Sequence, residues 1–196
     1  SSIPQLFAYN AFLVASNGIH TKVGPTYASW NFFKPWLRQE DGQHLSKEFK
    51  SQVEETGRSL DYLLLGLLDK KKLLDYVQNF IMYHKGNKIC AQNHQFLGVN
   101  NAIERFKYVM SPEVKEEDKG KMGVFWHTQG SGKSFSMVFL ARKIVRQFCG
   151  NFTFLVVTDR EDLDDQIYGN FLHCGFISES DDCRPKDSAK LREMLG

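Results

Sequence analysis

The sequence predicts an α/β fold, with a parallel sheet in its C-terminal half and a β-hairpin and helical segments before it. Three observations predict this fold. An apolar run at residues 124–126 is followed by a glycine-rich turn and an amphipathic helix from Lys133. A second apolar run, residues 152–157, has the length of a buried strand. Between residues 60 and 68, leucines recur at helical spacing.

Composition bounds the class of protein. The 196 residues suffice for one ordinary domain and part of another, and we expect the chain to be a fragment of a longer protein. Because 25 basic residues nearly balance 23 acidic ones, net charge does not indicate nucleic-acid binding, and any DNA contact must be local. The longest apolar run, residues 62–68, is too short to span a membrane, so no membrane partner is expected.

The cysteines indicate a reducing compartment. The four of them lie far apart, without a C-x-x-C pair and without histidines at metal-ligand spacing. Reduced thiols and a cytoplasmic location are the simpler interpretation. They are Cys90, Cys149, Cys174 and Cys183.

The N-terminal region is predicted to form a hairpin. Residues 9–16 are strongly apolar and end in Asn17-Gly18, which favours a type I′ turn, so residues 19–23 are expected to return as a second strand. An aromatic cluster follows, and we favour core packing over base stacking because the cluster lacks the several interleaved basic residues of a single-strand groove. Its members are Trp30, Phe32, Phe33, Pro35 and Trp36.

The middle of the chain is predicted to be helical. Residues 39–57 are polar and indicate a surface connector. A helix is then expected, its apolar pattern continuing through residues 73–81 past Lys70-Lys71-Lys72. The three lysines are interpreted as solvating a helix face or end, with contact to DNA phosphate as the alternative. Leucines at positions 60, 63, 64, 67 and 68 define the pattern.

A second helix is predicted within residues 89–108, with Gln92-Asn93-His94-Gln95 leading into its apolar face. Residues 114–121 alternate Lys, Glu and Asp, which predicts a mobile, solvated loop. Order is expected to resume at Met122.

A phosphate site is predicted between the first apolar strand and its helix. Glycines at Gly130 and Gly132 let backbone N–H groups turn inward at a helix N-terminus, which favours an anion. The helix dipole supplies only about 0.3–1 kcal/mol, so binding also needs the charge of Lys133 on the β/γ-phosphates and Ser134 on Mg²⁺. A glycine-rich turn before a surface helix is the alternative. His127 departs from the general pattern, which has Gly at that position.

Beyond this helix, Cys149-Gly150 is predicted as its C-cap, and residues 152–157 as a second, parallel strand joined by a right-handed crossover. Thr158 and Glu161 have the spacing of a capping box that starts another helix. A short last helix is expected at residues 189–195.

These motifs, in this order, resemble a known family. The stretch from Trp126 to Ser134, followed by Thr158-Asp159-Arg160, Leu163 and Gln166, resembles motifs I and Ia of the motor subunit of type I restriction enzymes, which are superfamily 2 translocases. His127 matches that family's usual form of the loop. Two further likenesses are Gln92-Asn93-His94-Gln95-Phe96, similar to the family's His-Gln element, and residues 10–18 with 30–36, similar to the tail of its nuclease domain.

The resemblance implies three regions and two cofactors, ATP and Mg²⁺. Residues 1–38 would be the tail of the nuclease domain, 39–86 a helical linker, and 87–196 the N-terminal half of the first RecA-like motor lobe. Lys133 carries the catalytic role, Ser134 binds Mg²⁺, and Gln95 contacts adenine. For Arg160, a surface arginine at a capped helix start is the alternative to a DNA contact. The phosphate ligands are Thr128, Gln129, Gly130, Ser131, Gly132, Lys133 and Ser134, and the DNA-backbone segment is Thr158, Asp159 and Arg160.

In the intact protein, this family would couple ATP hydrolysis to translocation of double-stranded DNA and to its cleavage, together with modification and specificity subunits. The nuclease residues and the Asp-Glu box are expected outside this sequence, so the fragment should bind nucleotide weakly and turn over none. Two alternatives remain: another superfamily 2 helicase or translocase without a nuclease, and a P-loop kinase or nucleotide-binding adaptor.

Overall fold

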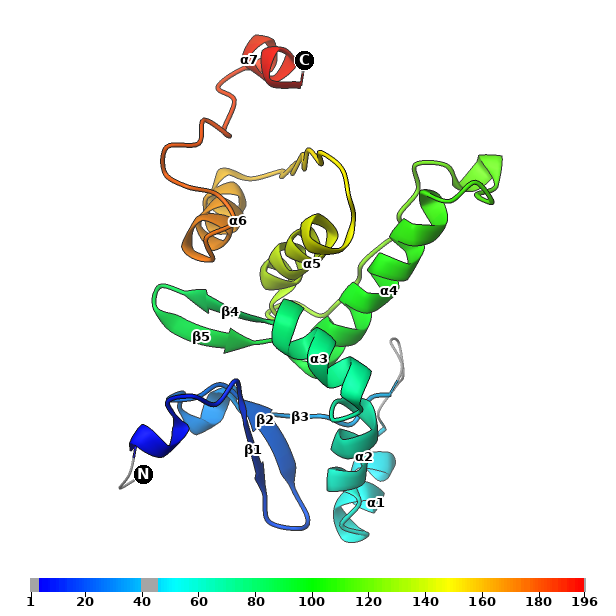
Figure 1. Ribbon diagram of the computed structural model, residues 1–196, viewed down its shortest axis with the longest axis vertical. Helices are drawn as coiled ribbons and strands as arrows, with labels where there is room; N and C mark the ends of the chain where they lie inside the picture. The colour runs from blue at the N-terminus through cyan, green and yellow to red at the C-terminus, as the bar shows by residue number, and fades with distance from the viewer. Residues whose placement is uncertain (1–3, 40–45, 196) are drawn as a thin grey trace.

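The computed structural model describes residues 4–39 and 46–195 (Figure 1). Within them the chain forms seven α-helices and two antiparallel sheets, ordered β1-β2-β3 and β4-β5. This confirms an α/β protein. The predicted parallel sheet is not seen, because every strand pair in the described part of the chain is antiparallel.

The N-terminal hairpin is confirmed, with a different turn. Strand β1 (Leu13–Ser16) pairs with β2 (Thr21–Gly24), and β3 (Lys34–Pro35) adds to β2. A type I′ turn needs two residues with positive φ, but Gly18 alone has one in this loop. The side chain of Asn17 closes the loop instead, since its Oδ1 accepts the N–H groups of Ile19 and His20. Two 3₁₀ turns, Pro4–Phe7 and Trp30–Phe32, flank the sheet.

Three helices follow, and the predicted continuous helical pattern is broken. Helix α1 (Lys47–Glu55) lies in the polar connector, of which residues 40–45 fall outside the described residues. Helix α2 (Ser59–Gly66) confirms the leucine periodicity. A new helix, α3 (Lys70–Asn79), then begins because the carboxylate of Asp69 accepts N–H bonds from its first turn, a standard N-cap. The three lysines are exposed at the start of α3.

A second hairpin, which the sequence pattern did not predict, follows α3. Strands β4 (Ile81–His84) and β5 (Asn87–Cys90) pair so that His84 faces Asn87 across a two-residue turn. Both turn residues, Lys85 and Gly86, have positive φ, at 50° and 78°, which is the type I′ geometry. Gly86 followed by Asn87 was the feature of the sequence that could have predicted this turn.

Four more helices agree with the predicted helices: α4 (Asn93–Val109), α5 (Lys133–Gln147), α6 (Glu161–His173) and α7 (Ser188–Leu195). Two predicted ends are wrong. Helix α5 is capped by Phe148 rather than by Cys149-Gly150, and α6 is capped by Arg160 without a side-chain bond, so Thr158 and Glu161 form no capping box. Among the described helices, none is long and apolar enough to cross a membrane.

The charged loop at residues 114–121 is solvated, as predicted, but it is also attached to α4. It contains a 3₁₀ turn, Glu116–Asp118. Arg105 and the hydroxyl of Tyr108 both donate to the Asp118 carboxylate, at 2.5 and 3.1 Å. The Arg105 hydrogen bond is the main reason that the pKa of Asp118 is lowered.

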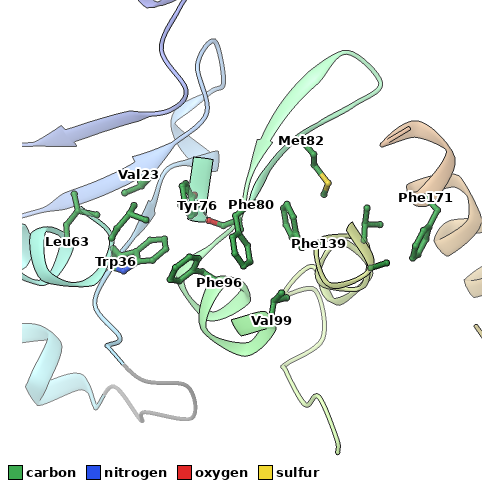
Figure 2. Packing of buried hydrophobic residues seen from close by; sticks show 14 of the residues in the cluster. Val23, Trp36, Leu63, Tyr76, Phe80, Met82, Phe96, Val99, Phe139 and Phe171 are labelled. Carbon is green, nitrogen blue, oxygen red and sulfur yellow. Dashed lines mark hydrogen bonds between the residues drawn. The ribbon is translucent and has the colours of Figure 1, made fainter. Parts of the chain in front are cut away.

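One hydrophobic core runs through the structure, from Val23 in the first sheet to Phe171 in α6 (Figure 2). Its centre is a set of aromatic rings that pack edge to face, tilted or stacked: Trp36, Tyr76, Phe80, Phe96 and Phe139. Burial of Trp36 and Phe33 confirms core packing for that part of the aromatic cluster, whereas Trp30 and Phe32 are exposed. Residues of all three predicted regions therefore share this core.

The two predicted parallel strands are absent as strands. Residues 124–126 and 152–157 are irregular, and Val124 and Val157 are 93% and 83% exposed. A strand is stable only when neighbouring strands satisfy its backbone groups, and the described residues provide none beside these segments.

The four cysteines are expected to differ in reactivity because they differ in exposure to solvent. All are free thiols, but burial raises the pKa of Cys90 to about 12, whereas Cys149 and Cys183 are exposed. Since the thiolate is the nucleophile, we expect iodoacetamide at pH 8 to alkylate Cys149 and Cys183 at least about tenfold faster than Cys90. Peptide mass spectrometry over a time course measures the rates, and equal rates would contradict the structure.

Candidate nucleotide-binding site

The predicted phosphate loop (residues 128–134, called the phosphate loop below) leads into the N-terminus of α5. Gly130 and Gly132 have φ values of 75° and 80°, a left-handed conformation that only glycine adopts without strain. Gly132 is the N-cap of α5, and its carbonyl accepts the N–H groups of Phe135 and Ser136. The N–H groups of Lys133 and Ser134, the first two residues of the helix, come before these bonds and have no intrahelical acceptor, so the loop has the geometry of an anion site.

Lys133 folds back over this loop. Its ammonium donates to the carbonyl oxygens of His127 and Thr128, at 2.5 and 3.2 Å, and the side chain is exposed. Two neutral carbonyls are weaker partners for an ammonium than an anionic phosphate would be. The charge therefore stays close to the backbone of the loop and can be reached from solvent.

The first turn of α4 binds the same loop. His94 Nε2 lies 2.9 Å from the carbonyl oxygen of Ser131, and Gln95 Nε2 donates to the carbonyl of Gly132 at 2.9 Å. The Gln95 amide oxygen also accepts the N–H of Gln92, which completes the cap of α4. The structure thus brings Gln95 to the phosphate loop, as a buried residue only 3% exposed. Sequence reasoning gave no role to His94, although it lies in the His-Gln element.

Close packing holds the segment before the loop against α4. A Cβ added at Gly98 would lie 2.7 Å from the ring of Phe125, so that ring contacts the helix backbone directly. The same ring lies 4.5 Å from the ring of His127, which in turn lies 4.7 Å from His94. Because Gly98 has no side chain, Phe125 can pack directly against α4 just before the chain enters the phosphate loop.

The predicted DNA-backbone residues lie apart from this site. Thr158, Asp159 and Arg160 connect the irregular segment to α6, and Arg160 is 3.8 Å from the carboxylate of Asp159. The arginine side chain is 66% exposed. Acidic residues fill the first turn of α6, where they complement the helix dipole.

A cleft of about 570 Å³ lies between residues 154–158, α6 and the C-terminal segment. Arg184 attaches that segment to α6 through the carboxylates of Asp164 and Asp165, with its guanidinium 5.1 Å from the ring of Tyr168. Thr158 is part of its wall. The phosphate loop does not line it, so the cleft is separate from the nucleotide site.

The sequence from the first turn of α4 onward matches a known family. Residues 94–196, which are 103 of the 196 residues, match the SWI2/SNF2 ATPase family. The chain belongs to the SWI2/SNF2 ATPase family. The matched part of this SWI2/SNF2 ATPase chain contains the phosphate loop and both of its α4 contacts.

Relatives of this SWI2/SNF2 ATPase chain are endonuclease subunits of type I restriction enzymes, which confirms the resemblance found in the sequence. The MjaIXP subunit of Methanocaldococcus jannaschii is 35% identical over 98% of the chain and 19% of its own length. The HindI subunit of Haemophilus influenzae is 35% identical over 98% of the chain and 18% of its own length. The chain thus spans about a fifth of the length of these relatives.

Proposed function

We propose that the chain is the ATP-binding part of the restriction subunit of a type I restriction enzyme. The observation that carries the proposal is the position of Lys133, whose ammonium lies over a glycine loop that opens α5 and is held by α4. Residues 128–134 bind the phosphates through their N–H groups, and Lys133 neutralises charge on the γ-phosphate.

Magnesium fits this site with few protein ligands. The hydroxyl of Ser134, at the start of α5, would bind Mg²⁺ together with phosphate oxygens. No cluster of three or more His, Cys, Asp or Glu side chains forms a metal site within the residues that the structure describes. Since Mg²⁺ is usually bound through one or two carboxylates plus substrate phosphates, Ser134 would be one protein ligand, and the Asp-Glu box expected outside this sequence would supply the carboxylates. When bound, the ion neutralises phosphate charge.

The exposed apolar residues of two segments support a RecA-like lobe. Val124 and Val157 project into solvent although their segments have strand-like composition. We propose that 124–126 and 152–157 become parallel strands when paired with strands from the rest of the longer protein. The proposed regions remain 1–38, 39–86 and 87–196.

Gln95 is proposed to contact adenine while it also supports the loop. Its amide already binds Gly132 and Gln92, so only the remaining N–H of Nε2 or a rotated side chain can reach a base. For Gln95→Ala, we expect ATP affinity to fall about tenfold, since one further hydrogen bond to the base is worth about 0.5–1.5 kcal/mol, and tripolyphosphate affinity to fall only about threefold. Calorimetric titration of both ligands measures this. An equal loss for both would assign Gln95 to the loop alone.

Thr158, Asp159 and Arg160 are proposed to contact the DNA backbone. The exposed guanidinium of Arg160 has only a loose partner in Asp159, at 3.8 Å, and is therefore available to a phosphate. In the intact protein, with modification and specificity subunits, ATP hydrolysis would drive translocation along double-stranded DNA before cleavage. ATP-driven translocation and cleavage of DNA are consistent with a cytoplasmic protein.

A triplex-displacement assay tests the proposed function. The full-length protein, with its partner subunits, should displace a triplex strand from duplex DNA with ATP but not with a non-hydrolysable analogue, and should then cleave the DNA. Displacement without cleavage would favour a superfamily 2 translocase that has no nuclease. Phosphoryl transfer to a small acceptor, without displacement, would favour a kinase.

A further inference from the structure

A charged side chain lies in the core where three helices meet. Lys143 of α5 has a side chain only 4% exposed, and its ammonium donates to both carboxylate oxygens of Asp75 of α3, at 2.5 and 2.7 Å. It also donates to the Asn100 amide oxygen of α4, at 2.5 Å, and lies 4.9 Å from the centre of the Phe80 ring. One ammonium group thus joins α3, α4 and α5.

The cluster is specific in geometry. An ammonium has three N–H donors, and Asp75 and Asn100 together supply the acceptors for all of them. Asp75 also accepts from Asn79, so its carboxylate is fixed from a second direction. Apolar side chains could slide past one another here, but a buried charge would lose its partners if any of the three helices moved.

Two of these helices, α4 and α5, also contact each other at the nucleotide site, through the loop that precedes α5. Lys143 is ten residues beyond Lys133 on α5, or about 15 Å along the helix. On α4, Asn100 is less than two turns beyond His94 and Gln95, which contact the carbonyls of Ser131 and Gly132. A shift of α5 along α4 would lengthen these 2.9 Å contacts.

We propose that Lys143 is a positioning residue for the phosphate loop, which it aligns with the first turn of α4 by holding α5 to Asp75 and Asn100. The inference rests on the proposed function. It also makes nucleotide affinity depend on α3, which lies in the predicted linker. Burial lowers the pKa of Lys143, and the hydrogen bond to Asp75 opposes that shift without cancelling it. Arg146, one turn further, donates to the carbonyl of Gln78 on α3 and reinforces the joint.

The test compares two lysine-to-methionine variants of the full-length protein. Lys143→Met removes the buried charge at similar length, and Lys107→Met is the matched control, since that lysine is exposed on α4. Tripolyphosphate and ATP are titrated separately by calorimetry. We expect Lys143→Met to weaken both ligands about tenfold or more, because the loop that binds phosphate is displaced, and Lys107→Met to stay within about twofold of wild type.

A double variant separates positioning from stability. In Lys143→Met/Asp75→Leu both charges are replaced by apolar groups, which often leaves stability unchanged or raised. We expect this variant to melt at or above the temperature of Lys143→Met and yet to retain the weakened binding of both ligands. Wild-type affinity in the folded double variant would overturn the inference, even if Lys143→Met alone did not fold.

The same titrations distinguish failure of this inference from failure of the proposed function. If the wild type binds neither ATP nor tripolyphosphate, the nucleotide site itself is wrong. If the wild type binds both, Lys133→Ala binds neither, and the double variant binds like wild type, then the proposed function stands and the positioning role of Lys143 is overturned.

Discussion

The Lys133→Ala variant of the full-length protein is expected to lose ATP affinity at least about 100-fold and to lose ATP hydrolysis. The ammonium is the group that can neutralise a phosphate above the N–H groups of Gly130 and Gly132. Hydrogen bonds to charged groups are worth about 1.5–3 kcal/mol each, so two such bonds to phosphate account for at least a 100-fold change. Fluorescent-nucleotide titration and phosphate release measure the two quantities.

The matched control is Lys119→Ala, which removes an exposed lysine that pairs with Glu116 in the charged loop. This variant should bind and hydrolyse ATP as wild type does. Because Lys133 is itself exposed, its replacement should change the free energy of unfolding by less than about 1 kcal/mol. ATP hydrolysis retained by folded Lys133→Ala would refute the proposed phosphate site.

Replacing Phe80 with alanine is expected to lower the free energy of unfolding by about 3–5 kcal/mol. The side chain is fully buried, and its ring lies 4.7 Å from that of Phe96 and 5.7 Å from that of Phe139 (Figure 2). It connects α4 and α5, and the ammonium of Lys143 lies over its face. The loss therefore includes a cavity and a cation–π contact as well as apolar burial.

Urea denaturation measures this loss, with Leu74→Ala as the control. Leu74 lies on α3, the helix whose C-cap is Phe80, but it is 58% exposed, so its truncation should cost less than about 1 kcal/mol. A loss below about 1 kcal/mol for Phe80→Ala would mean that the core does not depend on the ring joining α3, α4 and α5.

The elements that sequence analysis predicted well depend on local signals. Helices α4 to α7 appear where apolar spacing placed them, and Gly130 and Gly132 have the positive φ that a phosphate loop requires. The hairpin at residues 81–90 was missed because apolar residues up to Ile81 continue a helical pattern. The turn at Lys85-Gly86 ends that pattern, since both residues adopt a left-handed conformation that leads the chain back antiparallel.

Whether the two predicted parallel strands form could not be decided from their own residues alone. Their apolar composition indicates burial, but a strand forms only where neighbouring strands bind its backbone, and none of the described residues does so for 124–126 or 152–157. Composition therefore identified segments suited to a sheet without indicating which chain segments would be their neighbours.

By itself the sequence determined the glycine loop, the helix that follows it and the family, because glycine conformations, helical spacing and motif order are all contained in short stretches. Only the tertiary structure decided that His94 and Gln95 hold the carbonyls of the loop and that Lys143 joins Asp75. These partners are separated by 37 and 68 residues. Contacts at such separations follow from how helices pack, and no local pattern of residue types specifies them.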